Sequence, residues 1–322
     1  MTVVSAVIPS YNSARYLAQA IGSVQAQRRP VDEIIVVDDC SSDDSARLAA
    51  SLGARCLSTG KNGGPARTRN VGVQAARGDV IAFLDADDWW DPGHTEAVIG
   101  LLDRFPEAGV AFSRIRRCGA WTGESARFIP ADQPMDVFWV QLRDNIVPQM
   151  AVAVRRDALL AAGGYDETMR YAEDYDLWLR LARRHVPFVC THEVTANYRG
   201  HDRQATEQPL ELIRGAYEAR QRVYCSVLAE EEPDTAERVA RELRRVWERL
   251  LRQAWRSRDP AFYALALGLG DLVPGGAGIQ RRWRRARMFW PAWLAATRLW
   301  DRIPPRARRA LRAPLRGLFG LS

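Results

Sequence analysis

The sequence predicts an α/β fold with a mostly parallel central sheet, and two observations lead to that prediction. Short, nearly continuous apolar runs alternate with segments whose apolar residues recur at helical spacing. Strands that are apolar on both faces are typical of parallel sheets covered by helices on both sides. In addition, clusters of Asp, Asn and Pro follow several apolar runs, and α/β proteins bind ligands at those strand ends.

The first elements form a strand, helix and strand unit. Residues 3–8 are apolar and end at Pro9, and the run 33–38 ends in two aspartates. Between them, residues 14–27 place apolar side chains at helical spacing, with Ser13 as the expected N-cap. The unit therefore predicts two parallel strands joined by a helix.

The same alternation continues along the chain. Further helices are expected at 42–52, 66–76, 92–104, 156–162 and 173–184. Further strands are expected at 54–57, 80–84, 109–112, 150–154, 188–190 and 194–198. We expect these elements to form one domain over residues 1–205. Helices at 208–230 and 234–257 and a Gly-rich break then form a helical extension over 206–280.

The positive charge belongs to the last segment. The whole chain has a formal charge of +7, but residues 281–322 contain twelve arginines and one acidic residue, Asp301. This segment carries +11 and the remainder −4. Because aromatic and apolar residues interleave with the arginines, a basic amphipathic tail that contacts an anionic membrane is one interpretation. Packing on the rest of the chain is equally favoured, and nucleic-acid binding is disfavoured.

The cysteines and the apolar segments bear on the compartment. Five cysteines are scattered without Cys-x-x-Cys spacing, so neither a disulfide framework nor a zinc site is expected. The N-terminus lacks the pattern of a signal peptide, and no apolar stretch reaches the length of a membrane span. We expect a cytoplasmic protein, peripheral on the inner face of the cytoplasmic membrane if the tail binds lipid.

An acidic cluster at Asp85-Ala-Asp87 follows the expected strand at 80–84. Carboxylates at a strand end can hold Mg²⁺ or Mn²⁺ against the phosphate oxygens of a nucleotide. The alternative is an acidic turn in which Asp88 or Asp91 caps the following helix. The pair alone does not decide between them.

Five motifs in order resemble the inverting glycosyltransferases of family 2, which have the GT-A fold. They are Val7-Ile-Pro-Ser-Tyr-Asn12, Ile35-Val-Val-Asp-Asp39-Cys-Ser-Ser, Gly63-Gly-Pro-Ala-Arg-Thr-Arg-Asn70, Phe83-Leu-Asp-Ala-Asp-Asp88 and Glu173-Asp-Tyr-Asp-Leu-Trp178. The resemblance covers about residues 3 to 201. It implies a GT-A type, Rossmann-like nucleotide-binding domain.

The resemblance implies a nucleotide site built from several strand ends. Pro9, Tyr11 and Asn12 would line the nucleotide, with an aromatic ring packing on the base or ribose. Asp39 would accept a hydrogen bond from the base, while Arg69 would approach the diphosphate. Asp85 would contact the ribose or a water as well as the metal.

An inverting transfer needs a base that takes the proton from the acceptor hydroxyl. The resemblance places this role on Asp174, with Glu173 as the alternative. Asp174, Trp178 and Leu181 follow i, i+4, i+7 spacing and therefore share one helix face. Asp176 is expected to be a surface acid near the helix N-terminus.

The metal ligands implied are Asp87, Asp85 and His201, the last in the ending Tyr198-Arg-Gly-His201. The acceptor side is less specified by the sequence. Its candidates are Trp89, Trp90, Asn145 and Gln149. The two tryptophans can form the floor of a sugar subsite or pack under the sheet edge.

The resemblance thus implies a metal-dependent inverting glycosyltransferase with a UDP- or dTDP-linked sugar donor and a glycan or lipid-linked acceptor, acting in bacterial cell-surface polysaccharide synthesis. One alternative is a sugar-phosphate nucleotidyltransferase, disfavoured because the first strand is followed by Pro9-Ser-Tyr-Asn12 and not by a Gly-rich basic loop. A Rossmann oxidoreductase is disfavoured on similar grounds. The other alternative is a non-catalytic nucleotide-sugar-binding scaffold at a membrane.

Overall fold

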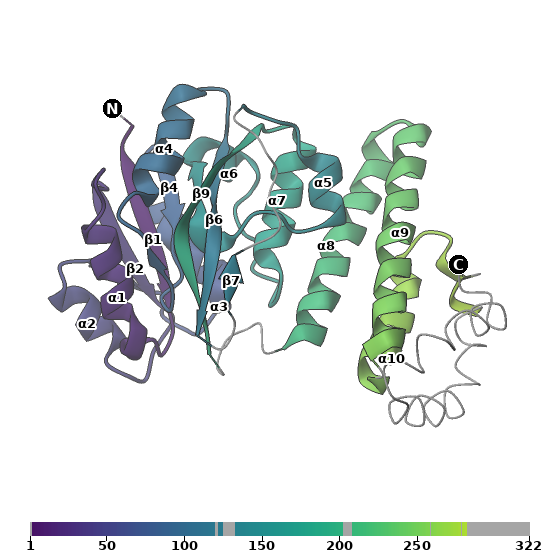
Figure 1. The fold of residues 1–322 in the computed structure, drawn as a ribbon, viewed down its shortest axis with the longest axis horizontal. Helices are drawn as coiled ribbons and strands as arrows, with labels where there is room; N and C mark the ends of the chain where they lie inside the picture. The colour runs from purple at the N-terminus through teal and green to yellow at the C-terminus, as the bar shows by residue number, and fades with distance from the viewer. Residues whose placement is uncertain are drawn as a thin grey trace, which may run out of the picture. The chain divides into compact units, whose positions relative to one another are not determined.

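The computed structural model describes residues 2–119, 122–124, 133–201, 208–257, 259–277 and 279–281. The chain divides into two compact units, Met1–Leu243 and Arg244–Ser322. The strands are β1 (Val4–Ser10), β2 (Glu33–Asp38), β3 (Arg55–Ser58), β4 (Val80–Phe83), β5 (Trp89–Trp90), β6 (Val110–Gly119), β7 (Gly123–Glu124), β8 (Val152–Arg155) and β9 (Phe188–Gly200). The first eight helices are α1 (Ala14–Gln25), α2 (Ser45–Ser51), α3 (Gly64–Ala75), α4 (His94–Arg104), α5 (Phe138–Arg143), α6 (Arg156–Ala161), α7 (Glu173–Arg183) and α8 (Pro209–Glu230). Helix α9 (Pro233–Ser257) contains the unit boundary, and α10 (Pro260–Gly268) follows it (Figure 1).

Within the described residues, nine strands form one sheet in the order β3-β2-β1-β4-β8-β6-β9-β5, and β7 pairs with β6. Strands β3, β2, β1 and β4 are parallel neighbours, and β6 is parallel to β9. Strand β8 runs antiparallel to both β4 and β6, which joins the two parallel parts. Most paired residues lie in parallel pairs, so the predicted α/β fold with a mostly parallel sheet is confirmed.

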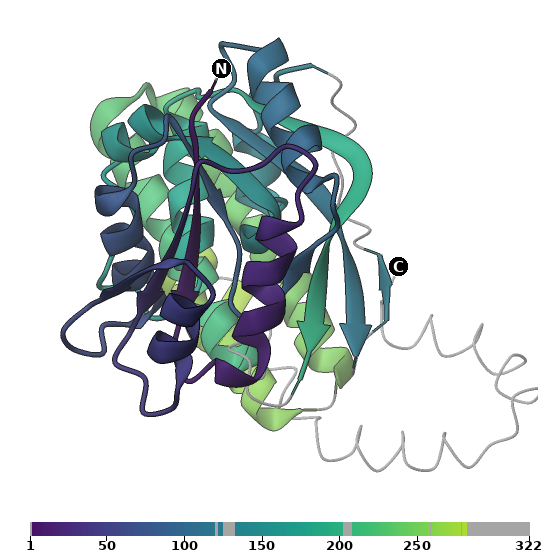
Figure 2. The ribbon, with the colours of Figure 1, turned by 90° about the vertical axis from the view of Figure 1, so that its left-hand side faces the viewer.

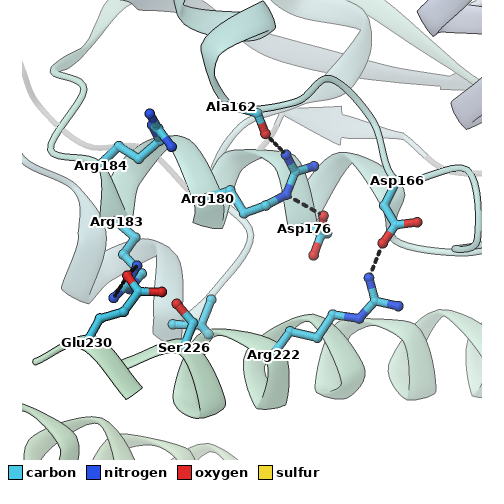
Figure 3. A pocket seen from close by; sticks show the side chains of 10 residues that line it. Ala162, Asp166, Asp176, Arg180, Arg183, Arg184, Arg222, Ser226 and Glu230 are labelled. Atoms are coloured by element: carbon cyan, nitrogen blue, oxygen red, sulfur yellow. Dashed lines mark hydrogen bonds and ion pairs between the residues drawn. The ribbon is translucent and has the colours of Figure 1, made fainter. Parts of the chain in front are cut away.

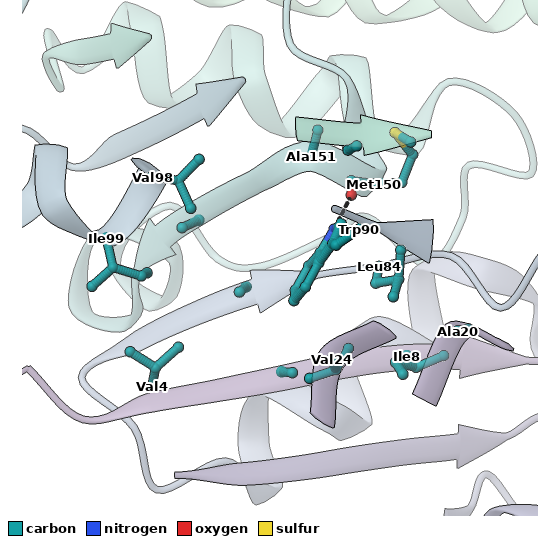
Figure 4. Close-up of a cluster of buried hydrophobic side chains, with 14 of the residues drawn as sticks. Val4, Ile8, Ala20, Val24, Leu84, Trp90, Val98, Ile99, Met150 and Ala151 are labelled. Atoms are coloured by element: carbon teal, nitrogen blue, oxygen red, sulfur yellow. Dashed lines mark hydrogen bonds between the residues drawn. The ribbon is translucent and has the colours of Figure 1, made fainter. Parts of the chain in front are cut away.

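Helices cover both faces of the sheet, and Figure 2 shows the first strands nearly edge-on with helices on either side. One face packs on α1, α2 and α4 and contains Val4 and Ile8, which are fully or almost fully buried (Figure 4). The other face packs on α3, where Gly72 allows the helix to approach closely. A Cβ at this glycine would lie 2.4 Å from a methyl carbon of Val7. Replacing a buried Leu or Ile of this core by Ala would cost about 2–5 kcal/mol.

Strand β9 differs from the prediction of two short strands at 188–190 and 194–198. It is one strand, Phe188–Gly200, that pairs with β6 along nearly its whole length. The polar residues between the predicted strands coincide with a register shift, where Phe112 pairs with Cys190 but Arg114 pairs with Val194. A bulge interrupts the apolar pattern without ending the strand, which explains the difference.

The second unit has its own small core. Trp247 of α9 is completely buried, and its indole N–H donates to the carbonyl of Ala266 at 2.6 Å. The Asp259 side chain caps α10 by accepting from the N–H groups of Ala261 and Phe262. In the part of the chain that the structure describes, no helix combines the length and the apolar character needed to cross a membrane. Residues 282–322 of the basic tail lie outside the described residues.

Candidate active site

The strand register brings three predicted motifs to one edge of the sheet. Ser10, at the end of β1, pairs with Asp38 at the end of β2. On the other side of β1, Val7 pairs with Phe83 of β4, two residues before Asp85. The loops that follow β1, β2 and β4 therefore begin side by side, as parallel strands require.

The first two loops are tied together by hydrogen bonds. Asn12 accepts from the Ser42 N–H at 2.8 Å with its side-chain oxygen, and its own N–H donates to the Ser41 hydroxyl at 2.8 Å. Asn12 and Cys40 both have positive φ, 51° and 62°, which non-glycine residues seldom adopt. Pro9 is half-buried, while Tyr11 has 54% of its surface exposed. Tyr11 is thus free to pack on a ligand at this edge.

Asp39 is buried and already well supplied with donors. Its carboxylate accepts from the backbone N–H groups of Gly63 and Gly64 at 2.9 and 2.8 Å and from the Thr59 hydroxyl at 2.7 Å. These bonds fix the turn into α3. Neighbouring Asp38 is also buried, and one of its oxygens has no partner among the described atoms.

Arg69 links two parts of the site that lie far apart in the sequence. Its guanidinium is buried and donates to Asp85 at 2.8 Å and to Glu173 at 2.7 Å. The central carbon of its guanidinium, Cζ, lies 5.5 Å from the ring centre of Tyr165. Arg69, which was expected to approach the diphosphate, therefore holds the acidic loop after β4 against the first turn of α7.

Asp174 follows Glu173 at the start of α7 and is half-buried. Burial, followed by the negative charge of Glu173, raises the pKa of Asp174 to about 6, although Arg69 opposes the shift. The Asn145 amide N–H₂ approaches the Asp174 carboxylate at 3.4 Å. Buried Gln141 donates to the Asn145 side-chain oxygen at 3.1 Å, which turns the amide donor toward Asp174.

Two of the three predicted metal ligands meet in the structure. The His201 ring nitrogen lies 2.9 Å from the Asp87 carboxylate, while Asp85 is held by Arg69. Within the described ranges, no group of three or more His, Cys, Asp or Glu side chains is arranged to hold a metal ion. Burial and then the charge of Asp85 raise the pKa of Asp87 above its usual range.

The capping alternative for the acidic turn does not describe the structure. Helix α4 begins after Gly93 and has no side-chain cap. Asp88 is buried and accepts from the Arg199 backbone N–H at 2.7 Å, and one Asp91 oxygen accepts from Asn197 at 2.8 Å. Burial and the nearby charge of Asp87 raise the pKa of Asp88 well above its usual range. The turn is therefore an acidic cluster without a capping role.

The four acceptor candidates have different surroundings. Trp90 is buried in the core, donates to the Met150 carbonyl at 2.7 Å and stacks on His94, so the packing interpretation applies to it (Figure 4). Gln149 is buried and hydrogen-bonds the hydroxyl of Tyr165 at 2.9 Å. Trp89 is half-buried, and Asn145 contacts Asp174. Of the four, Trp89 and Asn145 remain candidates for contact with an acceptor.

Asp176 contradicts the expectation of a surface acid. It is buried and forms an ion pair with Arg180, one turn further along α7, at 2.8 Å. Spacing alone could not show this, because α8 covers the face that was expected to be exposed. Figure 3 shows the pocket of about 320 Å³ between these helices, lined by Arg180, Asp176, Arg222 and others. Ion pairs of Arg180 with Asp176, Arg183 with Glu230 and Arg222 with Asp166 largely neutralise the charge of its lining, so it is a polar cleft separate from the strand-end site.

Three residues that shape the site were not predicted as site residues. Tyr165 packs on Arg69, Gln141 orients Asn145, and the Arg199 side chain donates to the Asp87 carbonyl at 2.8 Å. Arg199 also lies over the Trp89 ring, 4.5 Å from its centre. Its position next to the His201 motif was the only available signal. Nothing in the sequence near Gln141 or Tyr165 distinguishes them.

A mostly parallel α/β sheet with polar loops and a cluster of carboxylates at the carboxyl ends of its strands is the architecture of an α/β enzyme with its site at that edge. The family model "Glycosyl transferase family 2" matches residues 5–160. An uncharacterized glycosyltransferase of Rickettsia typhi is 31% identical over 227 residues, covering 67% of this chain and 70% of that protein. The chain belongs to glycosyltransferase family 2, as the five motifs indicated.

Other similar proteins agree with this assignment. The succinoglycan biosynthesis protein ExoU of Rhizobium meliloti is 30% identical over 235 residues, covering 68% of each chain. Among solved structures, residues 1–349 of TarS from S. aureus in complex with UDP-GlcNAc give a TM-score of 0.66 at 17% identity, covering 84% of this chain and 82% of that one. The mannosyltransferase PcManGT of Pyrobaculum calidifontis, in complex with GDP-Man and Mn²⁺, gives 0.59 at 16% identity, covering 94% and 88%. These structures show that the fold is of the GT-A type.

Proposed function

We propose that this glycosyltransferase is an inverting, divalent-metal-dependent enzyme that transfers a sugar from a UDP- or dTDP-linked donor to a hydroxyl of a glycan or lipid-linked acceptor. The observation that supports the proposal is the bridge from Asp85 through Arg69 to Glu173, which joins the loop after β4 to the first turn of α7, where Asp174 follows Glu173. The similarity to a succinoglycan biosynthesis protein supports a role in bacterial cell-surface polysaccharide synthesis.

In the proposed reaction, the Asp174 carboxylate accepts the proton of the acceptor hydroxyl. The hydroxyl oxygen forms a bond to the anomeric carbon as the bond from that carbon to the nucleoside diphosphate breaks on the opposite face. Glu173 is the weaker candidate for the base because it is already paired with Arg69. Asn145 holds the Asp174 carboxylate in place through its amide.

The residue types at and near the acidic turn have the chemistry of divalent-cation ligands, although the described side chains are not already arranged around an ion. Asp85 and Asp87 offer carboxylate oxygens and His201 a ring nitrogen, which suit Mg²⁺ or Mn²⁺. Burial and then the charge of Asp85 raise the pKa of Asp87, which is the direction expected for carboxylates that lie close together. When bound, such an ion would offset the charge that develops on the departing diphosphate. Asp85, Asp87 and His201 would hold it.

A first prediction concerns Asp87→Ala and the donor. We expect UDP- or dTDP-sugars with Mn²⁺ to raise the melting temperature of the native protein, because a ligand that binds only the folded state stabilises it. In Asp87→Ala this Mn²⁺-dependent stabilisation should disappear, and turnover with it. A thermal-shift screen of nucleotide sugars with and without Mn²⁺ measures this. An equal shift in Asp87→Ala would contradict the metal assignment.

A second prediction concerns pH. Asp174 acts as a base only when ionised, and its pKa is raised to about 6 by burial and by Glu173. Transfer should therefore fall as the pH drops through about 6, with one proton taken up per active site. Measuring kcat at saturating donor and acceptor between pH 5 and pH 8 would show this fall in rate, the acid limb of the pH–rate profile. A rate that stays constant down to about pH 4.5 would contradict the prediction.

The arrangement of the tail and the protein's location stay predictions. A cytoplasmic enzyme attached peripherally to the inner face of the membrane would meet a lipid-linked acceptor there. The basic composition of residues 281–322 supports such attachment. The domain division at residues 205 and 280 is likewise retained as a proposal.

A further inference from the structure

Helix α8 packs on α7 and comes closest to it at Gly215 (Figure 1). Gly215 is buried, and a Cβ at this position would lie 2.4 Å from the Tyr171 carbonyl oxygen. It would also lie 3.3 Å from the Cβ of Ala172, which precedes α7 and has a φ of 59°. A strained backbone of this kind persists only where the surrounding structure holds it. Helix α8 therefore supports the turn that leads directly into Glu173 and Asp174.

Arg220 of α8 makes a second contact, with the end of α5. Its guanidinium is buried and donates to the carbonyls of Leu142 and Arg143 at 2.9 and 3.2 Å. These are the last two residues of α5, and carbonyls at a helix end have no partner within their own helix. A positive charge is also favourable at this end of a helix. Arg220 therefore holds the end of α5 in place.

Tyr175, the residue after Asp174, joins these two contacts. Its hydroxyl donates to the Gln141 carbonyl at 2.6 Å, and its ring centre lies 4.8 Å from Cζ of Arg220. Tyr175 is almost completely buried, and a guanidinium over an aromatic ring is attracted to it. The first turn of α7, the end of α5 and the middle of α8 therefore share one buried cluster.

The end of α5 in turn places the amide that faces Asp174. The Gln141 side chain is completely buried, accepts from the Ile146 N–H at 3.2 Å and donates to the Asn145 side-chain oxygen at 3.1 Å. With both ends of its amide engaged, Gln141 has one orientation and so gives Asn145 one orientation. The Asn145 amide N–H₂ then lies 3.4 Å from the Asp174 carboxylate. The position of Asn145 therefore depends on the end of α5 that Arg220 holds.

We propose that Gly215 and Arg220 of α8 are positioning residues that hold Asp174 and Asn145 in the geometry needed for proton transfer. This inference rests on the proposed function, in which Asp174 is the base. Gly215 acts through the turn at Ala172, and Arg220 acts through the end of α5. Because α8 follows all five sequence motifs, a helix without a motif contributes to the catalytic geometry.

The test uses the full-length variants Arg220→Met and Gly215→Ala. Methionine cannot donate to the α5 carbonyls, and the added methyl of alanine forces α8 away from the Tyr171 carbonyl. Hydrogen exchange of the amides in residues 141–146 and 172–176 should become faster in both variants, because these segments lose their support. This measurement does not depend on knowing the substrates.

The same variants are compared in turnover and in nucleotide binding. Turnover is the release of nucleoside diphosphate, with water as the acceptor, from the nucleotide sugar that most stabilises the wild type in the thermal-shift screen. We expect kcat to fall by about ten- to a hundredfold, since a misplacement of about 1 Å has an effect of this size. The affinity for UDP with Mn²⁺ should stay unchanged in calorimetry. Arg220→Lys, which keeps a charge and a donor, should restore part of kcat.

Val227→Ala is the matched control. Val227 is completely buried on α8, about two turns beyond Arg220, so its truncation should lower the melting temperature. It leaves Gly215 and Arg220 in place. Exchange in the two segments and kcat should therefore stay at the wild-type values when measured well below the melting temperature.

Three results would overturn the positioning role. They are unchanged exchange in both Arg220→Met and Gly215→Ala, faster exchange with an unchanged kcat, and equal effects in Val227→Ala. Failure of the proposed function gives a different result, because full turnover by Asp174→Asn would remove the base assignment and leave the exchange data standing. Those data would still decide whether α8 holds Asp174 and Asn145.

Discussion

Replacing Asp174 by Asn is expected to reduce transfer by about 10²- to 10⁴-fold, the range that a general base contributes. The amide keeps the size of the carboxylate and can still meet Asn145 across the 3.4 Å contact, but it cannot accept the acceptor's proton. Donor binding should remain, because the nucleotide-side loops and Arg69 are unchanged. The measurements are product formation under saturating substrates and donor affinity by calorimetry.

Asp176→Asn supplies the matched control on the same helix. Asp176 is buried and paired with Arg180, so its replacement should lower the melting temperature while the active site keeps its base. Loss of transfer in Asp174→Asn with an unchanged melting temperature therefore reports chemistry and not folding. Full transfer by Asp174→Asn would exclude Asp174 as the base and leave Glu173 to be tested by Glu173→Gln.

The fold was predictable because its signals are local. Strands β1, β2 and β4 are mainly apolar runs bounded by turn residues, and α1 has its apolar residues Leu17, Ile21 and Val24 on one face. Where the prediction differed, the cause was non-local. The break in β9 is a register shift against β6, which depends on a partner strand about 80 residues away.

The positions of the site loops could be predicted from the sequence, but the contacts of individual side chains could not. Strand-end positions follow from topology, so the loops after Ser10, Asp38 and Phe83 could be grouped from the sequence. The contact partner of an individual side chain could not be predicted in this way. Trp90 follows the acidic turn just as Trp89 does, yet only Trp90 enters the core. Burial at such positions is decided by packing between distant elements.

The role of Arg69 also could not be predicted fully from the sequence. Its motif indicated a diphosphate-binding residue, but its guanidinium joins Asp85 to Glu173, which lies 104 residues further along the chain. A buried carboxylate without a partner is costly, so the buried Glu173 depends on this guanidinium, and the partly exposed Asp85 depends on it less. We infer that Arg69 positions the base as well as facing the nucleotide side. Its removal should then affect stability and proton transfer together.

Replacing Arg69 by Met is expected to lower the free energy of unfolding by about 3 kcal/mol, at the low end for a broken buried pair because Asp85 stays partly exposed. Arg69 also lowers the pKa of Asp174, so without it the acid limb of the pH–rate profile should move to higher pH. Denaturant unfolding measures the first effect, and kcat against pH measures the second.

Arg67→Met provides the comparison, because Arg67 lies on the same helix and its side chain donates a hydrogen bond to the Thr59 carbonyl at 3.3 Å. Arg67→Met should leave the acid side of the pH–rate profile at the same pH. It should change the free energy of unfolding by no more than about 1 kcal/mol. A merely structural Arg69 would lower stability and leave the pH limb in place, whereas Arg69→Lys, which keeps one charge, should restore part of both. An unshifted limb in a folded Arg69→Met protein would show that Asp174 is held by Asn145 and its helix alone.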